Sequence, residues 1–137
     1  PGPVGSGGPG GIHLPKIEAV HKENWEDSWN EETCLEAVMN NGAPELFRVN
    51  VDNRHLVDAT RRDPRNADLV TRKFELGAAL LAMSVVIASD KAGDRLGDAS
   101  ELLTLETQIS YVTSMISPML IPMLDSLGNL QLEMTPE

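Results

Sequence analysis

Two segments in the first half of the chain show the apolar–polar alternation that is typical of β-strands. They are Thr33–Met39, "TCLEAVM", and Glu45–Val51, "ELFRVNV". The second has apolar side chains on one face and polar ones on the other, namely Phe47, Val49 and Val51 against Arg48 and Asn50. The intervening "NNGAP" contains Asn-Asn-Gly, which readily adopts the positive φ angles of a tight turn. The pattern therefore predicts a β-hairpin with a half-buried second strand.

The residues before this hairpin carry a weaker pattern. A short extended segment is predicted around Ile17 and Val20, which do not share a strand face. Trp25 and Trp29 are four positions apart, a spacing that would bring the two rings together on one turn of a helix. This region is thus predicted to begin extended and to continue with a helical turn.

The octapeptide "VNVDNRHL", residues 49–56, marks a change from strand to helix. Asp52 is the predicted N-cap, because its carboxylate can accept hydrogen bonds from backbone N–H groups two or three residues later. Asn53 and Arg54 are predicted to be solvated. The short helix that follows is predicted to end at "RRDP", since a residue before proline resists the α conformation.

A longer helix is predicted from Pro64 or Asn66 to about Ser89. Its apolar and small residues keep a spacing of three and four: Leu69, Val70, Phe74, Gly77, Leu80, Leu81 and Ser84. Toward its end the segment is apolar on all sides, which is typical of a helix in the middle of a domain. Glycine costs about 1 kcal/mol relative to alanine within a helix, so Gly77 predicts the close approach of a neighbouring element. Residues 90–100, "DKAGDRLGDAS", are predicted to form a loop.

The clearest helical pattern lies near the C-terminal end of the sequence. Its apolar residues alternate between spacings of three and four, as in helix-on-helix packing: Leu102, Leu105, Ile109, Val112, Ile116, Met119 and Met123. Pro118 and Pro122 each remove a backbone hydrogen bond, so the helix is predicted to bend or stop near Ser117 and to resume as a second short helix. Gly128 is the predicted stop, and residues 129–137 are predicted to be a tail or a strand for a partner.

Together these elements predict an α+β fold that is mostly helical, with a β-hairpin or a three-stranded sheet packed against three or four helices. A chain of 137 residues fits one domain, predicted here to cover residues 12–130 with a tail at 131–137. Residues 1–11, "PGPVGSGGPGG", offer almost no side chains to bury and are interpreted as a flexible linker, either natural or left by cloning. This linker and the lack of an initiating methionine suggest a fragment of a larger protein.

The formal net charge of −10 argues against a protein built to bind nucleic acid or anionic lipid. The charge is uneven, because residues 48–73 are rich in arginine and no lysine or arginine follows Arg95. Such a dipolar surface suits protein partners or self-association. The longest apolar run, residues 76–89, is too short to span a bilayer. A single Cys34 without a secretory signal favours the reducing cytoplasm.

Candidate chemistry is confined to a few side chains. Asp52 and His55 could hold a metal or orient a water, and Cys34 with His55 could form a thiolate–imidazolium pair, as in a small hydrolase or metal-dependent enzyme. The favoured interpretation is structural: Asp52 caps the helix, His55 lies at the helix edge and Cys34 is a small core residue. Arg61 and Arg62 are candidates for contact with nucleic-acid phosphates, although the interleaved acids favour a solvated face. No catalytic, cofactor or metal site is predicted.

Three phrases, "FRVNVDNRHL", "RKFELGAALLAMSVV" and "ISPMLIPMLDSLG", together resemble the C-terminal region of large prokaryotic multidomain proteins. The N-terminal part of those proteins is a histidine-kinase/Hsp90-like ATPase or a subtilisin-like protease, and the groups are suspected of roles in defence or protein quality control. The resemblance covers Leu14 to Leu130 and includes neither nucleotide-binding motifs nor a Ser-His-Asp triad. It implies that this segment packs, dimerises or recruits while the activity lies elsewhere in the parent chain.

Methionines recur every four residues at Met115, Met119 and Met123. Flexible thioethers suit both core filling and adaptable interfaces, and the prolines of this irregular helix favour an interface. The predicted interface residues are Ile116, Met119, Leu120, Met123 and Leu124. The predicted function is accordingly a non-enzymatic assembly module that forms homo-oligomers or docks onto other domains of its parent.

Overall fold

The structure is a computed structural model that describes residues 14–96 and 104–134, with the side chains of residues 14–90 and 104–127. Its three-stranded sheet consists of β1 (Lys16–Val20), β2 (Leu35–Asn40) and β3 (Ala43–Asn50). The central strand β3 pairs in parallel with β1 and antiparallel with β2. The predicted hairpin is therefore present, the sheet has the third strand for which the prediction allowed, and the fold is α+β as predicted.

The hairpin turn has the backbone geometry that its sequence indicates. Asn41 has a φ of 54° and Gly42 a φ of 81°, the left-handed conformations that a type I′ turn requires. The first strand of the hairpin begins at Leu35 instead of Thr33. The reason is that the Thr33 carbonyl accepts hydrogen bonds from two asparagine side chains and does not take part in the ladder between β2 and β3.

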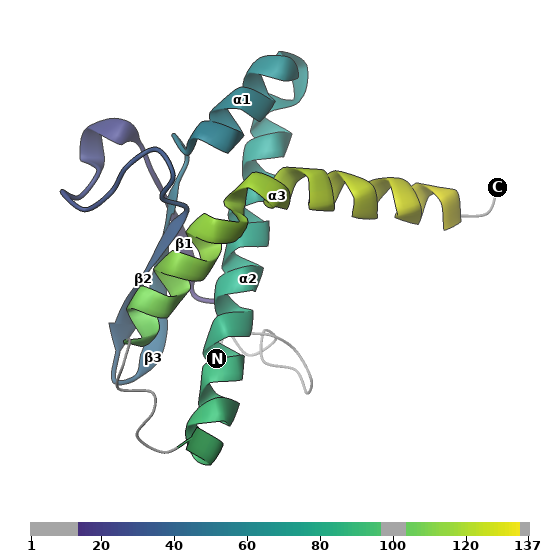
Figure 1. Ribbon diagram of the computed structural model, residues 1–137. Coiled ribbons are helices and arrows are strands. Elements are labelled where there is room, and N and C mark those ends of the chain that lie inside the picture. The colour runs from purple at the N-terminus through teal and green to yellow at the C-terminus, as the bar shows by residue number, and fades with distance from the viewer. Residues whose placement is uncertain (1–13, 97–103, 135–137) are drawn as a thin grey trace, which may run out of the picture.

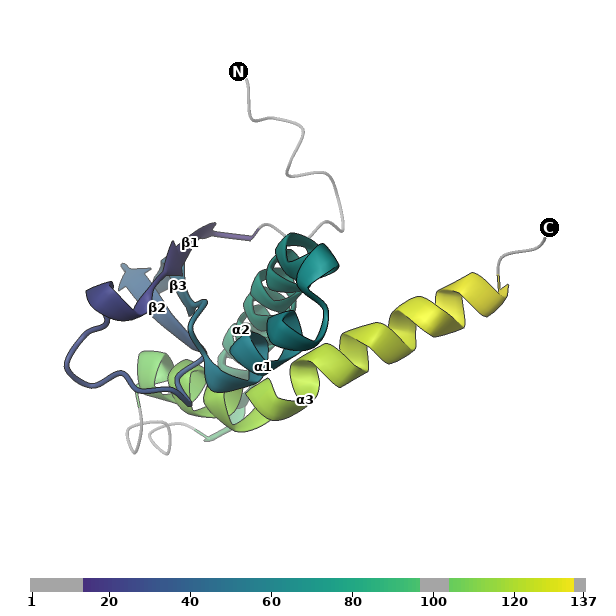
Figure 2. The same ribbon diagram turned by 90° about the horizontal axis from the view of Figure 1, so that it is seen from above.

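The described residues form three α-helices and two short 3₁₀ turns: α1 (Arg54–Arg62), α2 (Ala67–Leu96), α3 (Leu105–Met134), η2 (Lys22–Asn24) and η3 (Pro64–Asn66). Helix α2 and the first half of α3 lie side by side on one face of the sheet, and α1 packs against α2 near one end (Figures 1 and 2). This arrangement places one layer of helices over one layer of strands.

The core lies between the sheet and these two long helices. It contains alternate residues of β2 and β3 together with one side of each helix: Leu35, Ala37, Phe47, Val49, Phe74, Ala78, Ala79, Ala82, Ile109 and Leu120. Small residues on α2 let α3 approach closely. A Cβ atom at Gly77 would lie 3.1 Å from Cδ1 of Leu124, which confirms the predicted close approach at this glycine.

The predicted core face of α2 is partly wrong. Leu69 is 52% exposed and Leu80 is 44% exposed, whereas the neighbouring Ala78 and Ala79 are fully buried. The prediction took the large apolar residues as the buried ones. The sheet and α3 lie so close to α2 that alanine is the side chain that fits there, and the leucines point outward.

The predicted ends of both long helices are also wrong. Helix α2 continues to Leu96 instead of ending near Ser89, because residues such as Lys91 and Arg95 are good helix formers and one glycine does not stop a helix. Residues 97–100 of the predicted loop lie outside the described residues. Helix α3 runs through Gly128 to Met134 and so includes residues 131–134 of the predicted tail. The predicted linker, residues 1–11, also lies outside the described part of the chain.

Helix α3 contains both prolines and is a single bent helix, so the predicted division into two helices is wrong while the bend is present (Figure 1). Pro118 has no N–H to donate to the Ser114 carbonyl. That carbonyl instead accepts a hydrogen bond from Oγ of Ser117 at 3.0 Å. The substitute hydrogen bond satisfies the released carbonyl, and the helix continues beyond the bend.

The two tryptophans do not lie on a helix, because η2 ends before them at Asn24. Trp25 donates from Nε1 to Oδ1 of Asn50 at 2.9 Å. Trp29 is buried, with its ring centre 5.4 Å from the guanidinium of Arg48. The same guanidinium forms ion pairs at 3.0–3.3 Å with three carboxylates, those of Glu18, Glu26 and Glu36. Trp25 therefore binds Asn50 and Trp29 packs on Arg48, so the two tryptophans belong to separate polar clusters.

Candidate interaction surface

The segment "VNVDNRHL" is a structural junction between β3 and α1. Asn53 is the N-cap of α1, because its Oδ1 accepts hydrogen bonds from the backbone N–H groups of His55 at 2.9 Å and Leu56 at 3.3 Å. The predicted cap at Asp52 is wrong, since Oδ2 of Asp52 accepts from the backbone N–H of Lys22 at 2.7 Å. Both residue types are good caps, so the local sequence does not distinguish them.

Asn50 and Asn53 are both fully buried. Nδ2 of Asn50 donates to the Thr33 carbonyl at 2.8 Å, and Nδ2 of Asn53 donates to the same carbonyl at 3.0 Å. Oδ1 of Asn50 accepts from the backbone N–H of Asp52 at 2.9 Å. The two amides thus hold the end of β3 against the loop before β2, and the prediction that Asn53 is solvated is wrong.

Polar contacts connect this junction to the bend of α3. Nδ2 of Asn53 lies 3.4 Å from Oγ of Ser117, and the backbone N–H of Cys34 donates to Oγ of Ser114 at 3.2 Å. Every buried side-chain nitrogen and oxygen in the described residues has a hydrogen-bond partner. The junction therefore fixes the position of the bend, and with it the start of the second half of α3.

Asp52 and His55 have different partners. Nε2 of His55 lies 3.2 Å from Oε1 of Glu32, whereas Asp52 lies 3.8 Å from Nδ1 of His21. A hydrogen bond from Arg54 is the main reason that the pKa of the Glu32 carboxyl is lowered. Within the described residues, no three His, Cys, Asp or Glu side chains are grouped so as to hold a metal ion. The contacts agree with a structural role for Asp52 and His55.

Cys34 is fully buried, which confirms its interpretation as a small core residue. Burial raises the pKa of its thiol from 9.0 to about 12. At neutral pH the thiol is therefore protonated and is a poor nucleophile. Because the pKa is raised on folding, the stability linked to this group is complete below about pH 9 and is lost as the pH rises toward 12.

We expect Cys34 to resist a thiol-reactive dye at about pH 8 in the folded protein and to react rapidly in urea, because labelling requires both access and thiolate. The chain has one cysteine, so the absorbance change reports this residue alone. Labelling of the native protein at the rate of a free thiol would contradict the buried position.

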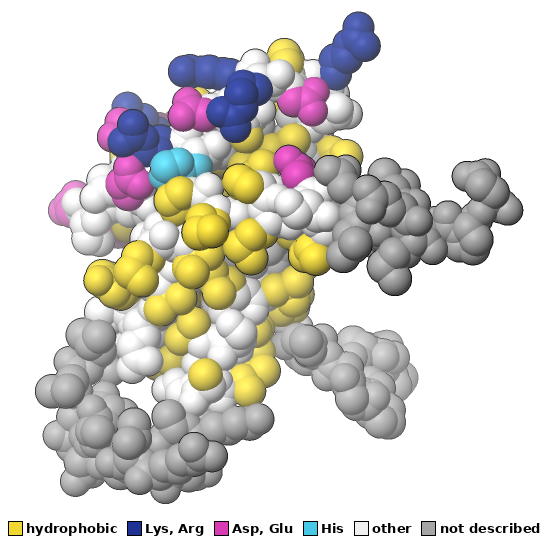
Figure 3. Space-filling view, turned by 45° about the vertical axis from the view of Figure 1, so that its right-hand side comes forward, with side chains coloured by type: hydrophobic (Ala, Val, Ile, Leu, Met, Phe, Trp, Pro, Cys, Tyr) yellow, Lys and Arg dark blue, Asp and Glu magenta, His cyan; other side chains and the backbone are white. Residues whose placement is uncertain are grey.

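Arg61 and Arg62 are exposed in the last turn of α1, where cations are favoured by the helix dipole. Exposed acids, Asp58 and Asp63, stand among them. Figure 3 shows basic and acidic side chains interspersed at this end of the molecule. The mixture agrees with the solvated-face interpretation of these arginines.

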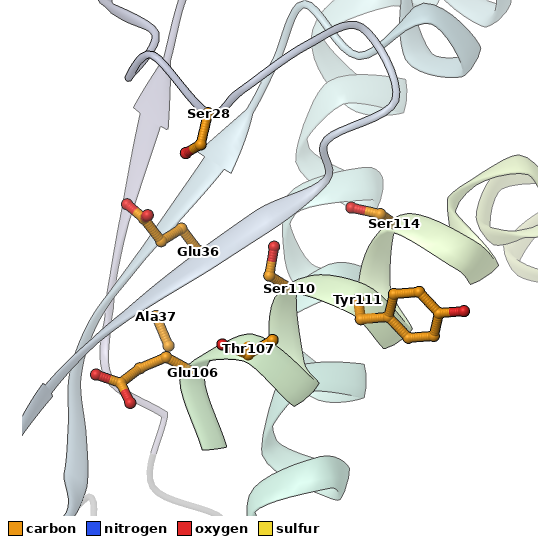
Figure 4. Close-up of a pocket in the computed structure, with 8 residues that line it drawn as sticks. All are labelled: Ser28, Glu36, Ala37, Glu106, Thr107, Ser110, Tyr111 and Ser114. Atoms are coloured by element: carbon orange, nitrogen blue, oxygen red, sulfur yellow. The ribbon is translucent and has the colours of Figure 1, made fainter. Parts of the chain in front are cut away.

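A polar pocket of about 490 Å³ lies between β2 and the first half of α3. Its polar lining consists of hydroxyls and carboxylates from Ser28, Glu36, Glu106, Thr107, Ser110 and Ser114. Figure 4 shows Ser110 and Ser114 on α3 and Glu36 on β2, with the ring of Tyr111 directed away from them. The lining includes no histidine, lysine or cysteine, so the carboxylates of Glu36 and Glu106 are its potential bases, and that of Glu36 is paired with Arg48 at 3.2 Å.

The five predicted interface residues divide between two sides of α3. Leu120 is buried in the core, and Ile116 and Leu124 are half-buried, with Ile116 packed against the core and Leu124 against Gly77. Met119 is 58% exposed and Met123 is 47% exposed on the outer side. The structure therefore separates a packing side from an outward side, which the seam spacing alone does not do.

Helix α3 carries a row of exposed apolar residues that winds gradually round the helix, because residues four apart are rotated by about 40°. Its residues recur at intervals of four and are 47–63% exposed: Tyr111, Met115, Met119, Met123 and Leu127, here called the α3 stripe. At the distal end of the stripe, an apolar groove of about 460 Å³ is lined by Pro118, Met119, Pro122, Met123, Ser126 and Leu127. The described residues therefore leave the α3 stripe and the two prolines of this groove accessible to solvent.

A second apolar row lies on α2. Its exposed members are 44–52% exposed: Leu69, Leu76, Leu80 and Ile87, here called the outer face of α2. Figure 3 shows hydrophobic side chains gathered over the helical layer, away from the charged end. The sequence gives a signal for this surface, since the helix was predicted to be apolar on all sides toward its end.

Comparison with protein-family models, with curated proteins and with solved structures gives no match. None of the helices in the described residues is both long enough and apolar enough to cross a membrane.

Proposed function

We propose that this domain is a non-enzymatic assembly module that associates with protein through the α3 stripe. The observation that carries the proposal is the row from Tyr111 to Leu127, in which five large apolar side chains are about half exposed or more. Met119, Met123 and Leu127 of this row line one apolar groove, and exposed apolar patches often mark interaction sites on soluble proteins. Aromatic residues and methionine are also the residues enriched in the cores of protein interfaces.

The chemistry of the surroundings favours a protein partner. The chain has a net charge of −10 and no lysine or arginine after Arg95, so α3 offers no cations for phosphates or anionic lipid headgroups. Methionine side chains adapt to the shape of a neighbour, and the prolines fix the bend that presents them. Covering the stripe would bury apolar groups worth roughly 1.5–3 kcal/mol for each side chain that becomes fully buried.

The enzymatic alternative has weaker support. It would use Asp52, His55 and Cys34, but the thiol is buried and the other two side chains have structural partners. The nucleic-acid alternative would use Arg61 and Arg62, whose acidic neighbours weaken any phosphate site. We retain assembly as the function, in a cytoplasmic homo-oligomer. On the resemblance described above, its parent would be a large prokaryotic protein with an ATPase or protease domain.

Sedimentation equilibrium tests the proposal. We expect the wild-type chain to self-associate at concentrations on the order of tens of micromolar. The double variant Met119→Glu, Met123→Glu should remain folded and become monomeric, because both residues are exposed and a buried carboxylate in the interface would be costly.

A matched control is Val38→Glu, which places the same charge on a 37% exposed residue of β2 outside the stripe. It should leave the association unchanged. A wild-type chain that stays monomeric throughout this range would refute self-association and leave only docking onto other domains of the parent. A double variant that associates as tightly as the wild type would refute the role of the α3 stripe.

A further inference from the structure

The exposed sulfur atoms of this domain are concentrated in the α3 stripe. Met115, Met119 and Met123 are 59%, 58% and 47% exposed. Among the methionines whose side chains the structure describes, the other two, Met39 and Met83, are half-buried and pack against the core. An oxidant in solvent therefore meets the thioethers of the stripe before those beside the core.

The single thiol of the chain does not compete for such an oxidant. Cys34 is fully buried, and burial raises the pKa of its thiol to about 12. Oxidation of a thiol requires both access and the thiolate form, and Cys34 offers neither at neutral pH. The accessible sulfur chemistry of the described residues is thus that of three methionines on one helix.

Hydroperoxides are the class of oxidant that these thioethers take. The sulfur attacks the terminal oxygen of the hydroperoxide, so that an S–O bond forms while the O–O bond breaks and the hydroxyl proton passes to the leaving oxygen. The sulfur is oxidised by two electrons, and the hydroperoxide is reduced to water or, for an organic hydroperoxide, to an alcohol. The product is methionine sulfoxide, which methionine sulfoxide reductases convert back to methionine.

A sulfoxide makes the stripe polar. Its oxygen is a hydrogen-bond acceptor, and covering it without a donor leaves an unsatisfied polar group within the contact. Met119 and Met123 also line the apolar groove on α3, so oxidation changes the lining of that groove directly. Because the methionines recur every four residues, one contact along the stripe would receive up to three such groups.

The fold of the domain does not depend on these three sulfurs. None of the three belongs to the buried core or to the partly buried residues that pack against it. The core contacts of α3 come from other side chains, such as Ile109, Ile116 and Leu120. Oxidation of the stripe is therefore expected to change association while the domain stays folded.

We infer that the stripe methionines are a modification site for hydroperoxides, and that their oxidation to the sulfoxide prevents the domain from associating. Association covers the same sulfurs, so oxidation traps the dissociated form and assembly protects against it. The selectivity of the modification follows from exposure alone. Its effect on association rests on the proposed function and adds the regulation of that surface.

Limited treatment of dilute protein with hydrogen peroxide, followed by mass spectrometry, measures the selectivity. Trypsin places Met39, Met83 and the stripe in separate peptides, and the stripe lies in the last one because no lysine or arginine follows Arg95. Fragmentation then assigns each added oxygen to a residue. In the native protein the stripe methionines should be oxidised at least about threefold faster than Met39 and Met83, whereas all should react at equal rates in urea.

Sedimentation equilibrium of the oxidised chain measures the effect on association. The Kd for self-association should rise at least about tenfold, because polar groups replace thioethers in the contact. Incubation with methionine sulfoxide reductases should restore the original Kd, which distinguishes a reversible switch from damage to the fold. Circular dichroism checks that the oxidised chain keeps its helices.

Two sets of leucine variants are matched controls, since leucine keeps a similar apolar volume and has no sulfur. The triple variant Met115→Leu, Met119→Leu, Met123→Leu should associate like the wild type and should not respond to peroxide. The double variant Met39→Leu, Met83→Leu keeps the stripe and should respond as the wild type does.

The outcomes separate this inference from the proposed function. If peroxide dissociates the triple variant as well as the wild type, oxidation acts elsewhere and the stripe is not the switch. If the stripe is oxidised and association persists, the switch is refuted while assembly stands. Equal oxidation of all these methionines in the native protein would refute the selective site. An untreated wild-type chain that is monomeric would refute self-association and, with it, its control by oxidation.

Discussion

Replacing Asn53 with alanine is expected to lower the free energy of unfolding by about 2–4 kcal/mol. The substitution removes the N-cap of α1, whose Oδ1 accepts from two backbone N–H groups. It also removes the buried amide that donates to Thr33 and approaches Ser117 of α3. Urea unfolding followed by circular dichroism measures the loss. The effect is large because one fully buried side chain contacts the loop before β2, the first turn of α1 and the bend of α3.

Asp52→Ala is the matched control, because it removes the neighbouring acceptor from the same junction. Its hydrogen bond to the backbone N–H of Lys22 is exposed, so water can replace the carboxylate and the cost should stay below about 1 kcal/mol. Asp52→Ala costing more than Asn53→Ala would mean that Asp52 is the cap after all. The ranking of the two variants therefore decides which residue begins α1.

Phe74→Ala is expected to cost about 3–5 kcal/mol of stability. The ring is fully buried between α2 and the rest of the core, and its removal leaves a cavity that the small residues around it cannot fill. Thermal and urea unfolding of dilute protein measure this loss in the isolated domain. A shift of this size would be a large part of the stability of a small domain.

Leu76→Ala is the control on the same helix, two positions further along the chain. Leu76 is 49% exposed on the outer face of α2, so its truncation should cost less than about 1 kcal/mol in dilute protein. Equal losses for the two variants would show that the two faces of α2 have been assigned wrongly.

The pattern of apolar and polar residues is sufficient to predict the type of each secondary-structure element. The alternation around Phe47 and Val49 and the turn residues Asn41 and Gly42 specify the hairpin, since strand periodicity and positive φ are local properties. Gly77 likewise predicts the close approach of a neighbouring element, because a glycine within a helix is costly without one, and the structure shows that this element is α3. The fold class and the buried Cys34 follow from the same local reasoning.

Tertiary structure decided which side of each element is buried. Toward its end helix α2 is apolar all round, so its periodicity does not say whether Ala78 or Leu80 faces the sheet, and only the close approach of α3 selects the alanine side. The choice of Asn53 over Asp52 as cap depends on Thr33 and Ser117, which are distant in the sequence. The bend at the prolines does not end α3 because Ser117 satisfies the released carbonyl. Local sequence determined the elements of this protein, whereas contacts between distant residues determined which apolar rows became the core and which were left for a partner.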